Sequence, residues 1–128
     1  MDAKETVINL FERWEAGDSS HFFDAVADNV KWTAIGTTPI SGVSHTKADY
    51  ELHTYGPLQK VFSGATSCKV KRVIAEGDCV VVEWHGETPL LNGGRYLNDY
   101  CWVVRVVEGK LSEVTGYFDT AAVDKLFA

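Results

Sequence analysis

Apolar residues in the first half of the chain recur three or four positions apart, which is the spacing of amphipathic helices. The first helix is predicted from four residues that would share one face: Val7, Leu10, Phe11 and Trp14. Gly17-Asp18 should end this helix, and a second short helix should follow with Asp18 or Ser19 as its cap. A short strand is expected over residues 30–35. A third helix is expected from about residue 44 to 62, with a disturbance at Gly56-Pro57.

The second half of the chain is rich in valine, threonine and aromatic residues and predicts β-strands. We place the strands at residues 66–75, 79–87, 95–107 and 111–119. Turn sequences separate them and leave no room for crossover helices, so the strands should form a meander of hairpins. Asp119 precedes Thr120 and should cap a last short helix. Helices followed by strands indicate the α+β class, with a curved sheet that closes over the helices and leaves a conical cavity.

Length and charge narrow the classes of protein that fit. The 128 residues suit a single domain, 1–128, and the formal net charge of −6 argues against binding to nucleic acid or to an anionic membrane. The chain has no apolar stretch of the about 20 residues that span a bilayer. Its first residues also lack the layout of a secretory signal. Cys68, Cys79 and Cys101 predict reduced core thiols in a cytoplasmic protein, because their number is odd and their spacing suits no zinc site.

Alternation of residue types predicts which way the last strands face. The last strand should turn three residues inward: Val114, Gly116 and Phe118. In the strand at residues 95–107, Arg105 alternates with Tyr100, Trp102 and Val104. Because Arg105 should face solvent, these three residues should face inward. The strand from Cys79 is ambiguous because both of its faces hold apolar residues. A two-residue turn at Asn92-Gly93, or a longer loop of the same parity, would turn Glu83 and His85 inward, and a one-residue change in loop length would reverse this.

With that register, the interior wall carries polar groups among aromatic ones. The candidate catalytic residues are Glu83, His85, Asn98 and Tyr100. The candidate ligand-binding residues are Trp14, Trp32, Trp102, Val114, Gly116 and Phe118. The opposite face would be an apolar patch suited to a homodimer interface, formed by Val80, Val82, Trp84, Cys101 and Val103. The alternative, with Glu83 and His85 in solvent, stays open.

The four polar candidates suit acid–base catalysis. A histidine beside a carboxylate is a workable general base, because the carboxylate raises its basicity and fixes its orientation. Glu83 and His85 are two positions apart on a strand, about 6–7 Å at the backbone, so they would bracket one substrate group rather than form a tight dyad. Asn98 and Tyr100 can donate hydrogen bonds to a carbonyl or an oxyanion. The other histidines lack the spacing of a metal site, and no metal or cofactor is expected.

Several short motifs along the chain are typical of one family. They are Glu15-Ala16-Gly17-Asp18, Ala27-Asp28-Asn29-Val30-Lys31-Trp32, Ile40-Ser41-Gly42, Gly94-Arg95-Tyr96-Leu97-Asn98-Asp99-Tyr100, Val107-Glu108-Gly109-Lys110-Leu111 and Gly116-Tyr117-Phe118-Asp119-Thr120. Through them nearly the whole chain resembles the SnoaL-like proteins of the nuclear-transport-factor-2-like superfamily, which includes ketosteroid isomerases, limonene-epoxide hydrolases and polyketide cyclases. The resemblance implies a cone-shaped, cystatin-like α+β fold. A strongly curved mixed or antiparallel sheet would wrap around three N-terminal helices and enclose a deep pocket, often in a homodimer through the outer sheet face.

The catalytic sets known in this family are not preserved here. By the resemblance, the general-base Asp of ketosteroid isomerases would fall near Thr33, their oxyanion-hole Tyr near Leu10, and their protonated Asp near Trp102. The residues at the catalytic positions of limonene-epoxide hydrolases are Trp32, Ala34, Glu83, His85 and Gly116. Asp119 also matches a family motif, and its place before a helix is better explained by capping.

Two functions remain. The first is a cofactor-free enzyme that isomerises, dehydrates, cyclises or hydrates a small apolar carbonyl or hydroxyl compound, with His85 as the proton-transfer group and Glu83 as its partner. The second is a non-catalytic binding module for a small hydrophobic ligand, in which Trp102 matters and His85 does not. The missing family catalysts favour the binding module. The polar cluster favours the enzyme, which we take as the expected function.

Overall fold

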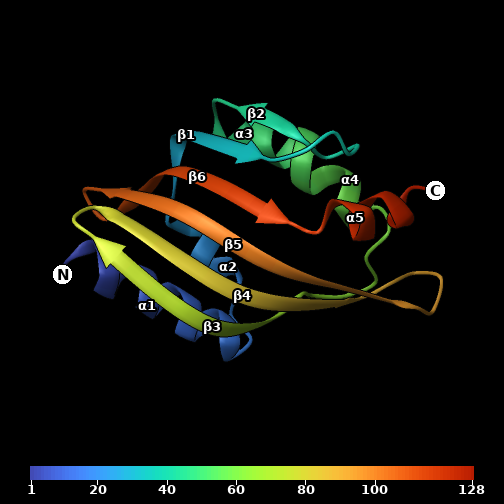
Figure 1. Cartoon of the computed structure of the whole chain (residues 1–128), viewed down its shortest axis with the longest axis horizontal. Helices are drawn as coiled ribbons and strands as arrows, with labels where there is room; N and C mark the ends of the chain where they lie inside the picture. Colours follow the sequence, from blue (N-terminus) through green and yellow to red (C-terminus); the bar gives the residue numbers. More distant parts are fainter.

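A six-stranded sheet curves around helices in the computed structural model, which describes residues 1–128 (Figure 1). The strands are β1 (Val26–Ala34), β2 (Gly42–Ser44), β3 (Ser67–Glu76), β4 (Cys79–Pro89), β5 (Arg95–Val107) and β6 (Lys110–Phe118). Their order across the sheet is β2-β1-β6-β5-β4-β3. β1 pairs parallel to β6 and every other pair is antiparallel, so the sheet is mixed. The predicted α+β class, with its curved sheet and short last helix, is confirmed.

Two N-terminal helices, α1 (Ala3–Glu15) and α2 (Ser20–Asp24), lie on one side of this sheet (Figure 1). The side chain of Asp2 caps α1 by accepting a hydrogen bond of 2.8 Å from the backbone N–H of Glu5. The buried face of α1 is the predicted one: Val7, Leu10, Phe11 and Trp14. This face packs mainly against β3, and it forms the main core together with the inner side of β4 and β5.

The third helical segment is irregular, as Gly56-Pro57 predicted. It comprises α3 (Lys47–Tyr50), a π-helical turn η1 (Glu51–Tyr55) and α4 (Gly56–Gln59). The N–H of Gly56 bonds to the carbonyl of Glu51 five residues earlier, and a Cβ on Gly56 would lie 2.8 Å from that oxygen. Glycine therefore permits the wide turn, and the proline that follows needs no N–H partner at the start of α4.

The hairpin between β4 and β5 has the opposite parity to the one predicted. Leu90 donates a backbone hydrogen bond of 2.9 Å to Gly94, which leaves a three-residue loop, and Gly93 takes φ +87° at its end. Such loops commonly end in a left-handed residue, and glycine adopts this conformation without strain. The odd loop length shifts the register by one residue, so that His85 lies opposite Asp99 rather than Tyr100 or Asn98.

The shift reverses both faces of β4. Val80, Val82 and Trp84 are buried in the core, and Glu83 and His85 lie on the outer surface. The predicted orientation of Glu83 and His85 was therefore wrong, and the alternative that was left open is correct.

Other local features agree with the sequence or add to it. The side chain of Asp119 caps α5 (Thr120–Leu126) as predicted, with 3.0 Å between its Oδ1 and the backbone N of Ala121. β2 was not predicted, and neither was the parallel pairing of β1 with β6.

The three cysteines are free, but only Cys68 is buried; Cys79 and Cys101 are half-buried. None of the helices combines the length and the apolar character needed to cross a membrane.

The orientation of β4 can be tested with one substitution at two neighbouring positions. Val82→Ala removes methyl groups from a fully buried site and should lower the free energy of unfolding by about 2 kcal/mol. Val81→Ala makes the same change on the half-buried outer face and should cost less than about 1 kcal/mol. Chemical denaturation measures both values. A larger loss in Val81→Ala would contradict the register.

The cap of α5 gives a second stability test. Asp119→Ala removes the acceptor for the Ala121 N–H and should cost about 1 kcal/mol, whereas Asp119→Asn, which keeps an oxygen acceptor, should cost less. Thermal unfolding of the two variants measures this difference. Equal losses of stability in the two variants would show that Asp119 does not stabilise the protein by capping α5.

Candidate functional site

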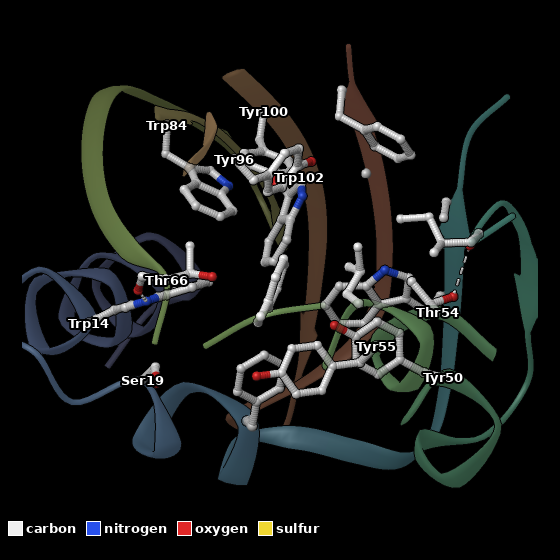
Figure 2. A pocket seen from close by; sticks show the side chains of 18 of the residues that line it. Trp14, Ser19, Tyr50, Thr54, Tyr55, Thr66, Trp84, Tyr96, Tyr100 and Trp102 are labelled. Atoms are coloured by element: carbon white, nitrogen blue, oxygen red, sulfur yellow. Dashed lines mark hydrogen bonds between the residues drawn. The ribbon is translucent and has the colours of Figure 1, made fainter. Parts of the chain in front are cut away.

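A cavity of about 110 Å³ opens between the inner face of the sheet and the helices (Figure 2). Nineteen residues line it and fifteen are hydrophobic, which makes it a site for an apolar molecule. The hydrophobic lining consists of Trp14, Phe23, Trp32, Ala34, Ile40, Tyr50, Tyr55, Leu58, Phe62, Ala65, Trp84, Tyr96, Tyr100, Trp102 and Phe118. Its volume is of the order that holds a single aromatic ring.

All four tryptophans of the chain line this cavity. Trp84 stacks on Tyr100 with ring centroids 4.1 Å apart and planes 13° apart. Trp102 meets Trp84 and Trp32 edge to face, at 5.0 and 5.2 Å. Trp32 in turn lies 3.9 Å from the ring of Tyr50. Because each ring is held by its neighbours, the aromatic wall is largely fixed before any ligand enters.

The lining contains no aspartate, glutamate, histidine, lysine or arginine. Its two threonine hydroxyls already have partners in the chain. Thr54 donates a hydrogen bond of 3.2 Å to the carbonyl of Ile40, and the hydroxyls of Thr66 and Thr88 are 2.7 Å apart. The other polar lining groups are mostly tyrosine hydroxyls and indole N–H groups.

Burial raises the pKa of three of the lining tyrosines. Desolvation raises the pKa of Tyr50 and of Tyr100 far above the usual 10, and it raises the pKa of Tyr96 as well. These hydroxyls therefore act as hydrogen-bond donors and acceptors, and they are unsuited to act as bases at neutral pH.

Tyr96, Asn98 and Tyr100 on β5 form a hydrogen-bonded group at one wall of the cavity. The hydroxyl of Tyr100 donates to that of Tyr96 across 3.0 Å, and the Asn98 amide donates to the same oxygen across 2.7 Å. Asn98 also donates to the carbonyl of Asp119 and accepts from its N–H, at 3.0 and 2.9 Å. Asn98 is thus buried, as predicted, but it holds Tyr96 and the start of α5 in place and does not line the cavity.

The structure places most of the predicted ligand-binding residues in the lining: Trp14, Trp32, Trp102, Gly116 and Phe118. Val114 is the exception, because it is fully buried in the core and does not reach the cavity. Of the four candidate catalytic residues, only Tyr100 lines the cavity.

The proposed acid–base pair lies outside. Glu83 forms an ion pair with Arg72, which lowers the pKa of its carboxyl, whereas burial in a pocket would have raised it. His85 is held between Asp99 and Glu87, with N···O distances of 2.9 and 3.2 Å. Neither side chain can reach a molecule in the cavity through the intervening sheet.

The outer apolar patch predicted as a homodimer interface is also changed. Val80, Val82 and Trp84 belong to the core, and only Cys101 and Val103 of that set lie on the outer face. The homodimer stays a prediction, which now rests on the family resemblance alone.

Sequence reasoning missed Tyr96, Tyr50 and Thr54. The signal for Tyr96 was present, because it is an even number of positions from Tyr100 and Trp102 and so shares their face, which was correctly assigned as the inward one. Tyr50 and Thr54 have the four-residue spacing of one helical face, and the π-turn adds Tyr55 to the side that faces the cavity (Figure 2).

Comparison with known proteins places this geometry in a family. A family model described as "SnoaL-like domain" matches residues 7–114. Comparison with curated protein sequences gave no match. Many solved structures share the fold, and three are representative.

The first is an NTF2-like protein from Burkholderia thailandensis, with 17% identity, 100% of this chain and 98% of that chain covered, and a TM-score of 0.80. The second, from Xanthomonas campestris, has a cystatin-like fold, 19% identity, coverage of 100% and 99%, and a TM-score of 0.81. The third is IdmH from Streptomyces antibioticus, for which polyketide cyclisation has been suggested, with 15% identity, coverage of 99% and 99%, and a TM-score of 0.71.

Identities this low establish the common fold and leave the activity open. The family match covers most of the chain, and it agrees with the curved sheet, the helices and the internal cavity described above. The chain belongs to the SnoaL-like domain family.

Proposed function

We propose that the protein binds a small, uncharged and largely apolar molecule in the aromatic cavity. The observation that carries this proposal is the absence of any ionisable carboxylate, imidazole or cationic side chain from the nineteen lining residues. An ion in this cavity would lose its hydration without gaining a counter-charge, which is costly. A neutral ring, in contrast, gains contact with preformed aromatic walls.

Cyclisation or isomerisation of the bound molecule is the second candidate function. The fold similarity to IdmH and the tyrosine donors at the cavity wall favour it. Since Glu83 and His85 lie outside, a reaction here would rest on hydrogen-bond donation from tyrosines and not on the acid–base pair predicted from the sequence. His85→Gln should therefore leave both binding and any turnover unchanged.

Intrinsic fluorescence provides the binding test, because every tryptophan lines the cavity. Toluene should change the emission at saturation, and benzoate and benzylammonium should bind at least about tenfold more weakly because each would bury a charge. Titration of each probe measures these affinities. Benzoate or benzylammonium binding as tightly as toluene would contradict the proposal.

A matched pair of variants locates the binding. Ala65 is both exposed and part of the lining, so it lies at the opening, and Ala65→Phe should obstruct entry and weaken toluene binding. Ala48 is exposed on α3 and outside the lining, so Ala48→Phe is the control and should bind toluene as the wild type does.

Burial of the tyrosines predicts a loss of stability at high pH. Their folded pKa values lie above the unfolded value near 10, so the folded state keeps protons that the unfolded chain releases. The contribution of these tyrosines to the free energy of unfolding should therefore be fully present below pH 10 and should fall as the pH rises above it. Tyr50→Phe removes one such group and should make the decline shallower. Chemical denaturation across this pH range measures the slopes, and equal slopes would contradict the assignment to Tyr50.

A further inference from the structure

One hydroxyl proton in the Tyr96–Tyr100 pair has no acceptor in the protein. The orientation of Asn98 is fixed, because its oxygen must accept from the N–H of Asp119 while its nitrogen donates to the carbonyl of the same residue. The amide nitrogen can therefore only donate to Tyr96, at 2.7 Å. Asn98 supplies a donor to the pair and takes none of its protons.

The Tyr96 oxygen accepts from both sides. A phenolic oxygen offers two acceptor positions, and here the Asn98 amide and the Tyr100 hydroxyl fill them. Tyr96 donates to no group of the chain, and its side chain lines the cavity. Its proton is thus available to a molecule inside, and the two accepted bonds polarise the O–H and strengthen the bond it can donate.

A second donor without a partner stands in the same wall. The indole Nε1 of Trp84 is buried and makes no hydrogen bond, and its ring stacks on Tyr100. Figure 2 shows Trp84, Tyr96 and Tyr100 together at one end of the cavity, away from Tyr50 and Tyr55. This end offers two donors without a partner, the Tyr96 hydroxyl and the Trp84 indole N–H, against one free acceptor, the Tyr100 oxygen, so it favours a ligand atom that accepts hydrogen bonds.

We propose that Tyr96 is the polar anchor of the cavity and that the ligand is a flat, uncharged ring compound bearing a carbonyl oxygen. This inference rests on the proposed binding function and adds the chemical class of the ligand. The oxygen is that of a neutral carbonyl and not an anion, because no cation lines the cavity to balance a negative charge. The aromatic walls accept the ring, and the Tyr96 hydroxyl fixes its orientation.

Acetophenone and α-methylstyrene form a matched pair of probes, because the second has a C=CH₂ group where the first has a C=O group and is otherwise identical. In Tyr96→Phe, the affinity for acetophenone should fall about fivefold and that for α-methylstyrene should stay the same, since a single neutral hydrogen bond is lost. Isothermal titration measures both affinities. The carbonyl stretching band of bound acetophenone, measured by infrared difference spectroscopy, should lie at lower frequency in the wild type than in Tyr96→Phe.

Two further variants separate a ligand contact from a structural role. Tyr117 is exposed on β6, so Tyr117→Phe should change nothing. Tyr100→Phe removes one hydrogen bond that Tyr96 accepts. It should lower the affinity for acetophenone by about twofold at most, because Tyr96 still donates a hydrogen bond to the ligand. A larger loss in Tyr100→Phe than in Tyr96→Phe would overturn the assignment of the anchor to Tyr96.

The remaining outcomes decide between this inference and the proposed function. If both probes bind the wild type and Tyr96→Phe affects them equally, or if the carbonyl band does not shift, binding stands and the anchor is overturned. Tighter binding of 4-nitrophenolate than of acetophenone would overturn the choice of an uncharged ligand. If neither probe binds the folded wild type, the proposed function and the inference both fail.

Discussion

The parity of the loop between β4 and β5 determines what fills the interior of this protein. With three residues between the paired ends, the strands register so that Val82 lies opposite Trp102 and Trp84 lies opposite Tyr100. The large side chains of both strands then share one face, and they form the aromatic wall of the cavity. The charged positions of β4 fall on the other face, where they make ion pairs in solvent. A loop one residue shorter would exchange the two sets.

The same constraint explains why the cavity is neutral. Charged side chains of the sheet reach solvent on its outer face, so the interior holds aromatic rings with a few hydroxyls and one buried amide. Asn98 is the single polar residue of β5 that is deeply buried, and it is tolerated because its amide makes three hydrogen bonds. Those bonds also connect the cavity wall to the cap of α5. The polar part of the site is therefore held by the same contacts that close the end of the fold.

The fold was predictable from the sequence to a greater extent than the site was. The apolar face of α1, the inward face of β6 and the cap at Asp119 depend on local patterns, and each was predicted correctly. The facing of β4 was not, because Val80, Val82 and Trp84 compete with Val81 for the interior and alternation alone cannot choose between them. The choice depended on one loop residue near Gly93, and the assignment of Glu83 and His85 to the interior failed with it. The parallel pairing of β1 with β6 joins distant segments, for which local patterns give no signal.

The π-turn has a consequence for how this cavity could change during evolution. A π-helical turn contains one residue more than the α-helical turn it replaces, and an α-helix advances by about 100° per residue. If residues 51–55 wound as a regular α-helix with none removed, they would cover more than one turn, and every later side chain of the segment, including Leu58, would rotate relative to those before it. The set of residues facing the cavity would then change without any substitution in the lining. In this region, the shape of the pocket depends on how the helix winds as much as on the identity of its side chains.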